Sequence, residues 1–123
     1  MSKTSSNFDF RKPVAYDGEA KRAFHNYARR RLRQLAAALG LAPQSYDRRS
    51  NVGGIAVSGE VTMHADHVYV QACQPATGHD TGLMFRTCQD RKDYHGGPNH
   101  FASLDLLNRP DDLARRIRET CRV

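Results

Sequence analysis

The fold is decided by residues 61–72, VTMHADHVYVQA, in which apolar and polar side chains alternate with a period of two. Such alternation predicts strands with one buried face, and the dipeptide Ala65-Asp66 between the two alternating halves predicts a hairpin turn. The expected register pairs Met63 with Val68 and Val61 with Val70. These four side chains then share one apolar face, and the polar side chains in between share the opposite face.

The alternation extends to both sides of this hairpin and predicts three to five strands. Ile55 and Val57 share the phase of Val61, so residues 53–64 form either one long strand or two strands around Ser58-Gly59-Glu60. Residues 83–87 alternate again, and residues 101–106 are expected to form a short last strand. Residues 43–51 are polar and are interpreted as a connection.

A helix is predicted before the strands, between an N-cap at Asp17 and a C-terminal Gly40. Its apolar stripe consists of Phe24, Ala28, Leu32, Leu35 and Leu39. A second helix is expected after Asn108 as N-cap, with Leu113 and Ile117 on its apolar side. The predicted fold class is therefore α+β, with an antiparallel meander between two helices that both pack on one face of the sheet. Residues 1–12 are expected to be a flexible arm, and residues 13–123 a single domain.

The first helix is strongly basic. Six of the nineteen Lys and Arg residues lie between Lys21 and Arg33, and no carboxylate occurs between Ala20 and Tyr46. A face that is merely solvated usually mixes charges, because like charges one turn apart are unfavourable. The pattern therefore favours a surface that binds a polyanion, although a plain solvated helix face is the alternative. The candidate binding residues are Lys21, Arg22, Arg29, Arg30, Arg33, Arg48 and Arg49.

Composition restricts the class of protein. The 123 residues carry a formal net charge of +6, and no apolar run approaches the length of a membrane span. The first ten residues lack the apolar segment of a secretory signal. Three cysteines without CxxC spacing argue against a disulfide framework. We therefore expect a cytoplasmic protein with no membrane partner.

The sequence also contains candidate zinc ligands, namely His64, His67 and Cys88. In the expected hairpin register His64 and His67 face each other across the turn. If Leu83 pairs with Ala72, Cys88 lies beside His67 on the next strand. Two imidazoles and one thiolate are suitable zinc ligands, although the spacing matches no zinc signature. Otherwise the two histidines simply flank a hairpin turn, and no cofactor is expected.

Residues 86–100 form a second chemically rich segment around Gly96-Gly97. Its candidate site residues are Arg86, Arg91, Lys92, Tyr94, His95, Asn99 and His100. Consecutive glycines allow backbone N–H groups to approach an anion. Cys88 with His95 or His100 also has the composition of a nucleophile and its base. The alternative is a polar loop in which Asp93 pairs with a neighbouring arginine.

The run Arg91-Lys92-Asp93-Tyr94, followed by Gly96-Gly97 and Asn99-His100, resembles a stretch of small uncharacterised proteins from proteobacterial plasmids and phages. The resemblance is confined to this loop and implies no activity. It implies an accessory gene of a mobile element.

These observations predict a small binding module without catalysis that engages nucleic acid or another polyanion through its basic helix. The polar sheet face could add a base-stacking contact at Tyr69. Neither helix-turn-helix spacing nor the aromatic pattern of RNA-recognition motifs occurs, so weak sequence specificity is expected. One alternative is a mobile-element modulator that binds an acidic protein, and another is a metal-dependent or cysteine enzyme around the Gly-Gly loop. The oligomeric state is left open.

Overall fold

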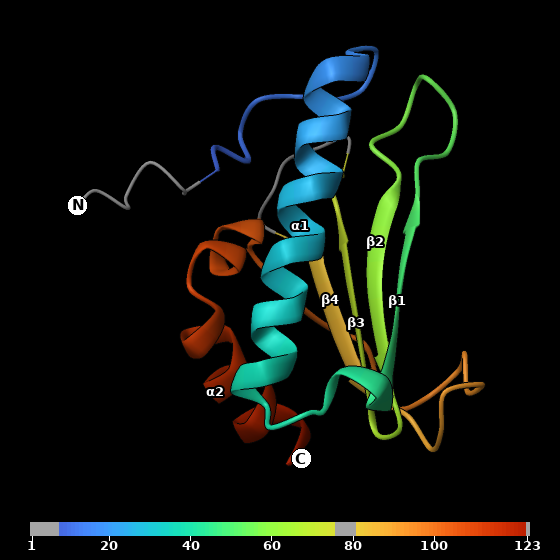
Figure 1. Ribbon diagram of the computed structural model, residues 1–123, viewed down its shortest axis with the longest axis vertical. Coiled ribbons are helices and arrows are strands. Elements are labelled where there is room, and N and C mark those ends of the chain that lie inside the picture. Colours follow the sequence, from blue (N-terminus) through green and yellow to red (C-terminus); the bar gives the residue numbers. More distant parts are fainter. Residues whose placement is uncertain (1–7, 76–80, 123) are drawn as a thin grey trace.

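Helix α1 (Gly18–Ala38) begins and ends where its capping residues predict. Asp17 is the N-cap, and its carboxylate accepts a hydrogen bond of 3.0 Å from the Ala20 backbone N–H. Leu39 is the C-cap, and Gly40 follows with a φ of +78°, a conformation that suits glycine. The computed structural model describes residues 8–75 and 81–122, and α1 lies along the sheet that these residues form (Figure 1).

The sheet is an antiparallel meander in the order β1-β2-β3-β4-β5. Its strands are β1 (Tyr46–Asn51), β2 (Glu60–Ala65), β3 (Val68–Cys73), β4 (Leu83–Thr87) and β5 (His100–Ala102). The chain ends with the 3-10 helix η3 (Leu104–Asn108) and helix α2 (Pro110–Cys121). The protein is therefore an α+β domain with its helices on one face of the sheet, as predicted.

The predicted hairpin is present, but its register is shifted by two residues. Strand β2 continues through Ala65, so the turn lies at Asp66-His67 and not at Ala65-Asp66. The observed pairs are Met63 with Val70 and Val61 with Ala72. Side chains alternate with a period of two, so a shift of two residues leaves every side chain on its predicted face. Val61, Met63, Val68 and Val70 are accordingly all buried.

Two expectations about the first strands are wrong. The polar segment 43–51 contains strand β1, whose residues are nearly all exposed. Residues 53–59 are a loop and not a strand, with Ile55 and Val57 exposed to solvent. The glycines at either end of this loop have positive φ angles, +63° at Gly53 and +73° at Gly59. Such angles interrupt a strand and allow the chain to reverse between β1 and β2.

The first described residues meet the segment before α2 beside α1. Asn108 is not the N-cap of α2, which is Arg109. The Asn108 side chain instead exchanges hydrogen bonds of 3.0 and 3.1 Å with the Phe8 backbone and accepts one from the Tyr27 hydroxyl. Phe10, which lies in the stretch expected to be a flexible arm, is buried against the aromatic rings of α1. Residues 1–7 of that arm lie outside the described residues.

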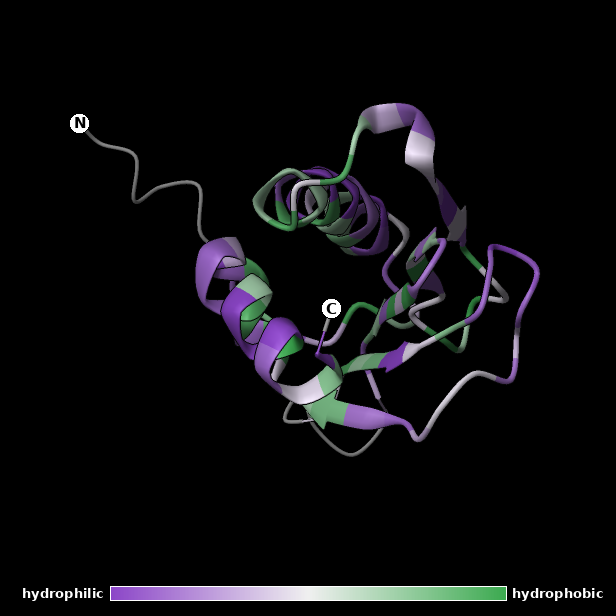
Figure 2. Cartoon of the chain, turned by 90° about the horizontal axis from the view of Figure 1, so that it is seen from below, coloured by the Kyte–Doolittle hydropathy of each residue, from purple (hydrophilic) through white to green (hydrophobic). Residues whose placement is uncertain are grey.

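The core lies between the helices and the sheet. In Figure 2 both helices lie on the same side of the sheet, and the outward side of α2 is hydrophilic. The largest buried side chains come from every layer and include Phe24, Leu32, Leu35, Met63, Phe85, Leu113 and Ile117. One face of the sheet is therefore used for packing against the helices, and the other face, called here the outer face, carries mainly polar side chains.

Candidate nucleic-acid interface

The exposed side of α1 and the adjacent edge strand β1 form one basic surface, which we call the basic face. It consists of Lys21, Arg22, Arg29, Arg33, Arg48 and Arg49. Arg48 joins the two elements, because its guanidinium donates a hydrogen bond of 3.1 Å to the Arg29 carbonyl. A depression of about 480 Å³ lies between the C-terminal half of α1 and β1, and it is lined by Arg33, Arg48 and Arg49 together with Pro43, Tyr46 and Asp47. The fold thus brings together cations that lie well apart in the sequence.

The cations of the basic face have no carboxylate partners. Across residues 8–75 and 81–122, none of the six takes part in an ion pair. Other arginines do, such as Arg91 with Asp47 at 3.3 Å and Arg115 with Asp112 at 2.5 Å. Lys21 and Arg48 have neutral acceptors instead: the Lys21 ammonium donates to the Gly54 carbonyl at 2.7 Å, and Arg48 donates to the Arg29 carbonyl. The basic face therefore presents a positive potential that the described part of the protein does not neutralise.

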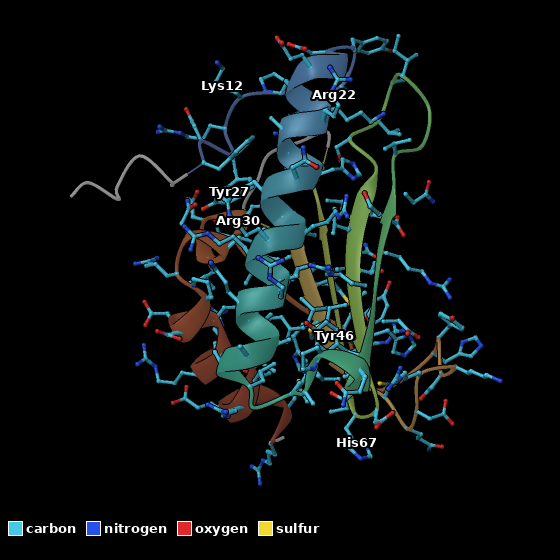
Figure 3. All side chains as sticks on the ribbon, viewed as in Figure 1. Lys12, Arg22, Tyr27, Arg30, Tyr46 and His67 are labelled. Carbon is cyan, nitrogen blue, oxygen red and sulfur yellow. The ribbon has the colours of Figure 1, made fainter. Side chains whose placement is uncertain are left out.

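Arg30 belongs to a different surface from the one predicted. Its guanidinium lies 5.1 Å from the centre of the Tyr27 ring, and that ring packs 5.3 Å from Phe8. Figure 3 shows Tyr27 and Arg30 on the side of α1 away from β1. Arg31 also lies there and donates to the Tyr27 hydroxyl at 2.8 Å. The prediction placed Arg30 at the flank of the arginine ridge, and the contact with Tyr27 turns its guanidinium away from β1.

A hollow of about 510 Å³ opens on the outer face of the sheet, and we call it the outer hollow. Its lining residues are Asp47, Arg49, Ser50, Asn51, Glu60, Thr62, His64, Tyr69 and Tyr94. Most of them come from neighbouring positions of β1, β2 and β3. Asp47 is paired with His64, and His64 with Tyr69, so the three side chains form one row across the sheet. Arg49 belongs both to this hollow and to the basic face.

Three rings form one wall of the outer hollow. The His64 ring packs edge to face against Tyr69 at 5.0 Å and against Tyr94 at 5.2 Å between ring centres. His64 is only 4% exposed, and its Nε2 lies 3.1 Å from the Asp90 carbonyl oxygen. A carbonyl can only accept, so Nε2 carries a proton and His64 is held in one orientation. The histidine therefore fixes both tyrosines relative to the sheet.

Tyr94 reaches the hollow from the loop of residues 88–99, and Asp93 organises that loop. The Asp93 carboxylate accepts backbone N–H bonds from Gln89, His95 and Gly96 at 2.9 to 3.0 Å. These bonds, led by the one from Gln89, lower the Asp93 pKa to about 2. Gly96 has a φ of +57°, and a Cβ there would lie 2.3 Å from the Thr87 carbonyl oxygen. The Gly-Gly segment is thus a tight closure of the loop.

Arg91 attaches the same loop to the sheet. Its guanidinium pairs with Asp47 at 3.3 Å and with Asp66 at 3.4 Å, and it donates to the Gln44 carbonyl at 2.6 Å. The loop is therefore attached to one end of the β1–β2 pair, where β1 begins and β2 ends, which places Tyr94 at the rim of the outer hollow. The remaining loop candidates do not join this cluster. Lys92, His95 and Asn99 are exposed, and His100 lies in β5 with its ring 5.7 Å from Phe85.

Arg86 lies on β4 directly opposite Tyr69 and packs against its ring. Its guanidinium lies 4.4 Å from the centre of the Tyr69 ring and the residue is 6% exposed. Its buried Nε has no hydrogen-bond acceptor among the described atoms. The cation–π contact replaces part of the lost hydration and holds the tyrosine ring in place.

The residues of the predicted zinc site are not arranged as expected. The shifted register places His64 opposite Tyr69, and His67 lies in the exposed turn. Leu83 does pair with Ala72, and the Cys88 N–H donates to the His67 carbonyl at 3.1 Å, so that part of the register is confirmed. Within the described ranges no three His, Cys, Asp or Glu side chains are grouped as metal ligands. Zinc binding stays a prediction.

Cys88 also differs from the suggested nucleophile. It is buried, its thiol donates to the Ala65 carbonyl at 3.3 Å, and burial raises its pKa to about 11. Within the described part of the chain, Cys88 forms no hydrogen bond with His95 or His100. A thiol with this pKa is almost entirely protonated near neutral pH and is therefore a weak nucleophile.

Comparison with known proteins gives no relative: no family model, no curated protein and no solved structure matches this chain. The described residues contain no helix that is long and apolar enough to cross a bilayer. The interface must therefore be interpreted from its own chemistry. The alternation of β2 and β3 predicted Thr62 and Tyr69 on the outer face, whereas Glu60 was not recognised as a lining residue. Its signal was the same alternation, which places it on the outer face with His64.

Proposed function

We propose that this protein is a binding module for nucleic acid and that the basic face contacts the phosphate backbone. The observation that supports the proposal is the set of six cations on α1 and β1 without a single carboxylate partner in the described chain. Guanidinium groups bind phosphates in a bidentate manner, and the release of condensed counterions drives such binding. The cytoplasmic location and the origin in a mobile element stay predictions.

The contacts predicted by this proposal carry little sequence information. Phosphate contacts position a protein on a nucleic acid, whereas base contacts specify the sequence. We therefore propose affinity that depends strongly on salt and weakly on sequence.

Replacing Arg22, Arg29 and Arg33 together with glutamine tests the proposal. All three side chains are exposed, so the fold should tolerate the change. Binding should weaken by a similar factor for unrelated sequences, and the salt slope should fall by about 0.7 to 0.9 for each lost phosphate contact. Gel mobility shift at several salt concentrations measures both quantities.

The matched control replaces Arg115, Arg116 and Arg122 with glutamine. These residues are also exposed and lie on or directly after α2. Replacing them removes the same formal charge. The control should bind like the wild type. Equal weakening of the two variants would show that overall charge, and not the basic face, governs binding.

A further inference from the structure

We propose that the ligand is a single-stranded polynucleotide and that one unpaired base enters the outer hollow beside Tyr69 and Tyr94. This inference rests on the proposed function, because it concerns the strand whose phosphates contact the basic face. It names a second contact surface, on the opposite side of β1, and it restricts the class of nucleic acid.

The two surfaces are continuous across a single edge strand. β1 is the first strand of the sheet, and among the described strands it pairs with β2 alone. On the helix side of β1, Arg48 borders the arginine-lined depression; on the outer face, Asn51 and Arg49 border the outer hollow. Arg49 lines both spaces. A flexible strand can therefore bend over the sheet edge, with phosphates along the arginines and a base on the outer face.

The outer hollow has the properties of a site for a planar, uncharged group. Its volume of about 510 Å³ lies in the usual range for small-ligand sites. Tyr94 is 56% exposed although its ring is anchored by His64, so it offers a fixed aromatic surface. Stacking on such rings is tolerant of sequence, because every base has a π-face. Tyr69 is fixed as well, by the Arg86 guanidinium and by its hydrogen bond of 3.1 Å to Gln71.

The carboxylates of the hollow determine which part of a nucleotide it accepts. Asp47 is neutralised by Arg91, but Glu60 has no ion-pair partner in the described chain. A phosphate inside the hollow would be repelled by Glu60, whereas the N–H groups of a base could donate to it. Phosphates therefore belong outside, near Arg33, Arg48 and Arg49, and the base belongs inside.

A duplex does not fit this arrangement. Its bases are stacked inside the helix, and a protein reaches them only through a groove or by extruding a nucleotide, which costs a few kcal/mol. An unpaired base can enter the hollow without that cost. Single strands should therefore bind more tightly than a duplex of the same sequence, despite their lower charge density.

Fluorescence anisotropy with a labelled ten-nucleotide strand, as RNA and as DNA, and with the matching duplexes tests the inference. Wild-type protein should bind at least one single strand more tightly than its own duplex. Tyr94→Ala should weaken single-strand binding by about 5- to 150-fold, the equivalent of 1–3 kcal/mol for one stacked base. Its salt slope should not change, because no phosphate contact is lost.

Two further variants make the result specific. Tyr94→Phe keeps the ring and should bind like the wild type, and Tyr16→Ala removes an exposed tyrosine that does not line the hollow and should have no effect. Duplex binding equal to or tighter than single-strand binding, or an unchanged affinity of Tyr94→Ala, would overturn the inference while leaving the basic face intact. Wild-type protein that binds no nucleic acid at low salt would overturn both proposals.

Discussion

Asp93 shows how one residue shapes the candidate interface. Its carboxylate receives three backbone N–H groups from the loop that carries Tyr94, and the Arg86 guanidinium adds a smaller favourable charge interaction. These contacts stabilise the ionised form and lower the pKa from 3.8 to about 2. The loop is therefore organised by the charge of a partly buried carboxylate.

Acid should destabilise the folded protein through protonation of Asp93. Because the Asp93 pKa is lowered in the folded protein, its stabilising contribution is complete above the unfolded-state pKa, near 4. That contribution should be lost as the pH falls from about 4 to the folded-state value of about 2. Wild-type stability should fall towards that of Asp93→Asn across this window, as measured by thermal unfolding at closely spaced pH values. Parallel profiles for the two proteins would contradict the assignment.

At the scale of elements, the β2–β3 hairpin connects the core to the interface. Val70 lies between Met63 on β2 and Phe85 on β4, and all three side chains are fully buried under the helices. The neighbouring residue Tyr69 points to the outer face and lines the hollow. A slip of one residue would exchange these two surfaces, so burial of the valine face also orients the tyrosine.

Truncating Val70 to alanine tests this arrangement. The variant should lose about 1–3 kcal/mol of unfolding free energy, through lost apolar burial and a residual cavity. Val52→Ala is the matched control, because Val52 is 55% exposed in the β1–β2 loop and should change stability by less than about 0.5 kcal/mol. Chemical denaturation gives both values. A Val70→Ala protein as stable as the control would mean that the valine face is not the buried one.

Some of these elements were predictable from the sequence and others were not. Helix α1 was predictable because its signals are local: an apolar stripe, the Asp17 cap and Gly40. The faces of the hairpin were predictable from the alternation, but its register was not, since a shift of two residues gives the same pattern. Strand β1 was missed because an edge strand exposed on both faces has no alternation. Ile55 and Val57 were misassigned because their phase alone suggested burial.

The candidate interface was less predictable than the fold. The arginines of α1 form a recognisable ridge, but their continuity with Arg48 and Arg49 depends on the pairing of β1 with β2. The position of Tyr94 depends on ion pairs between Arg91 and two aspartates that are distant in sequence. Such long-range contacts leave no periodic signal. The apparent zinc site arose from the same uncertainty in register.

At the scale of the whole molecule, charge is distributed unevenly over the fold. The protein has a net charge of +6, and the cations of the basic face are concentrated on α1 and β1. Asp9, Asp47, Asp66 and Asp112 form ion pairs with arginines outside the basic face. The core and the loop ion pairs hold the basic face and the outer hollow on either side of one edge strand. The central claim is that these two surfaces together bind nucleic acid.

The most direct test is the affinity of the wild-type protein for a short single strand as a function of salt. Titrations at increasing salt concentrations, followed by anisotropy, give log K against log salt concentration. If three to six cations of the basic face contact phosphates, the plot should be linear with a slope between about −2 and −4, at about −0.7 per contact. An affinity that does not change with salt, or no saturable binding at about 50 mM salt, would contradict the account.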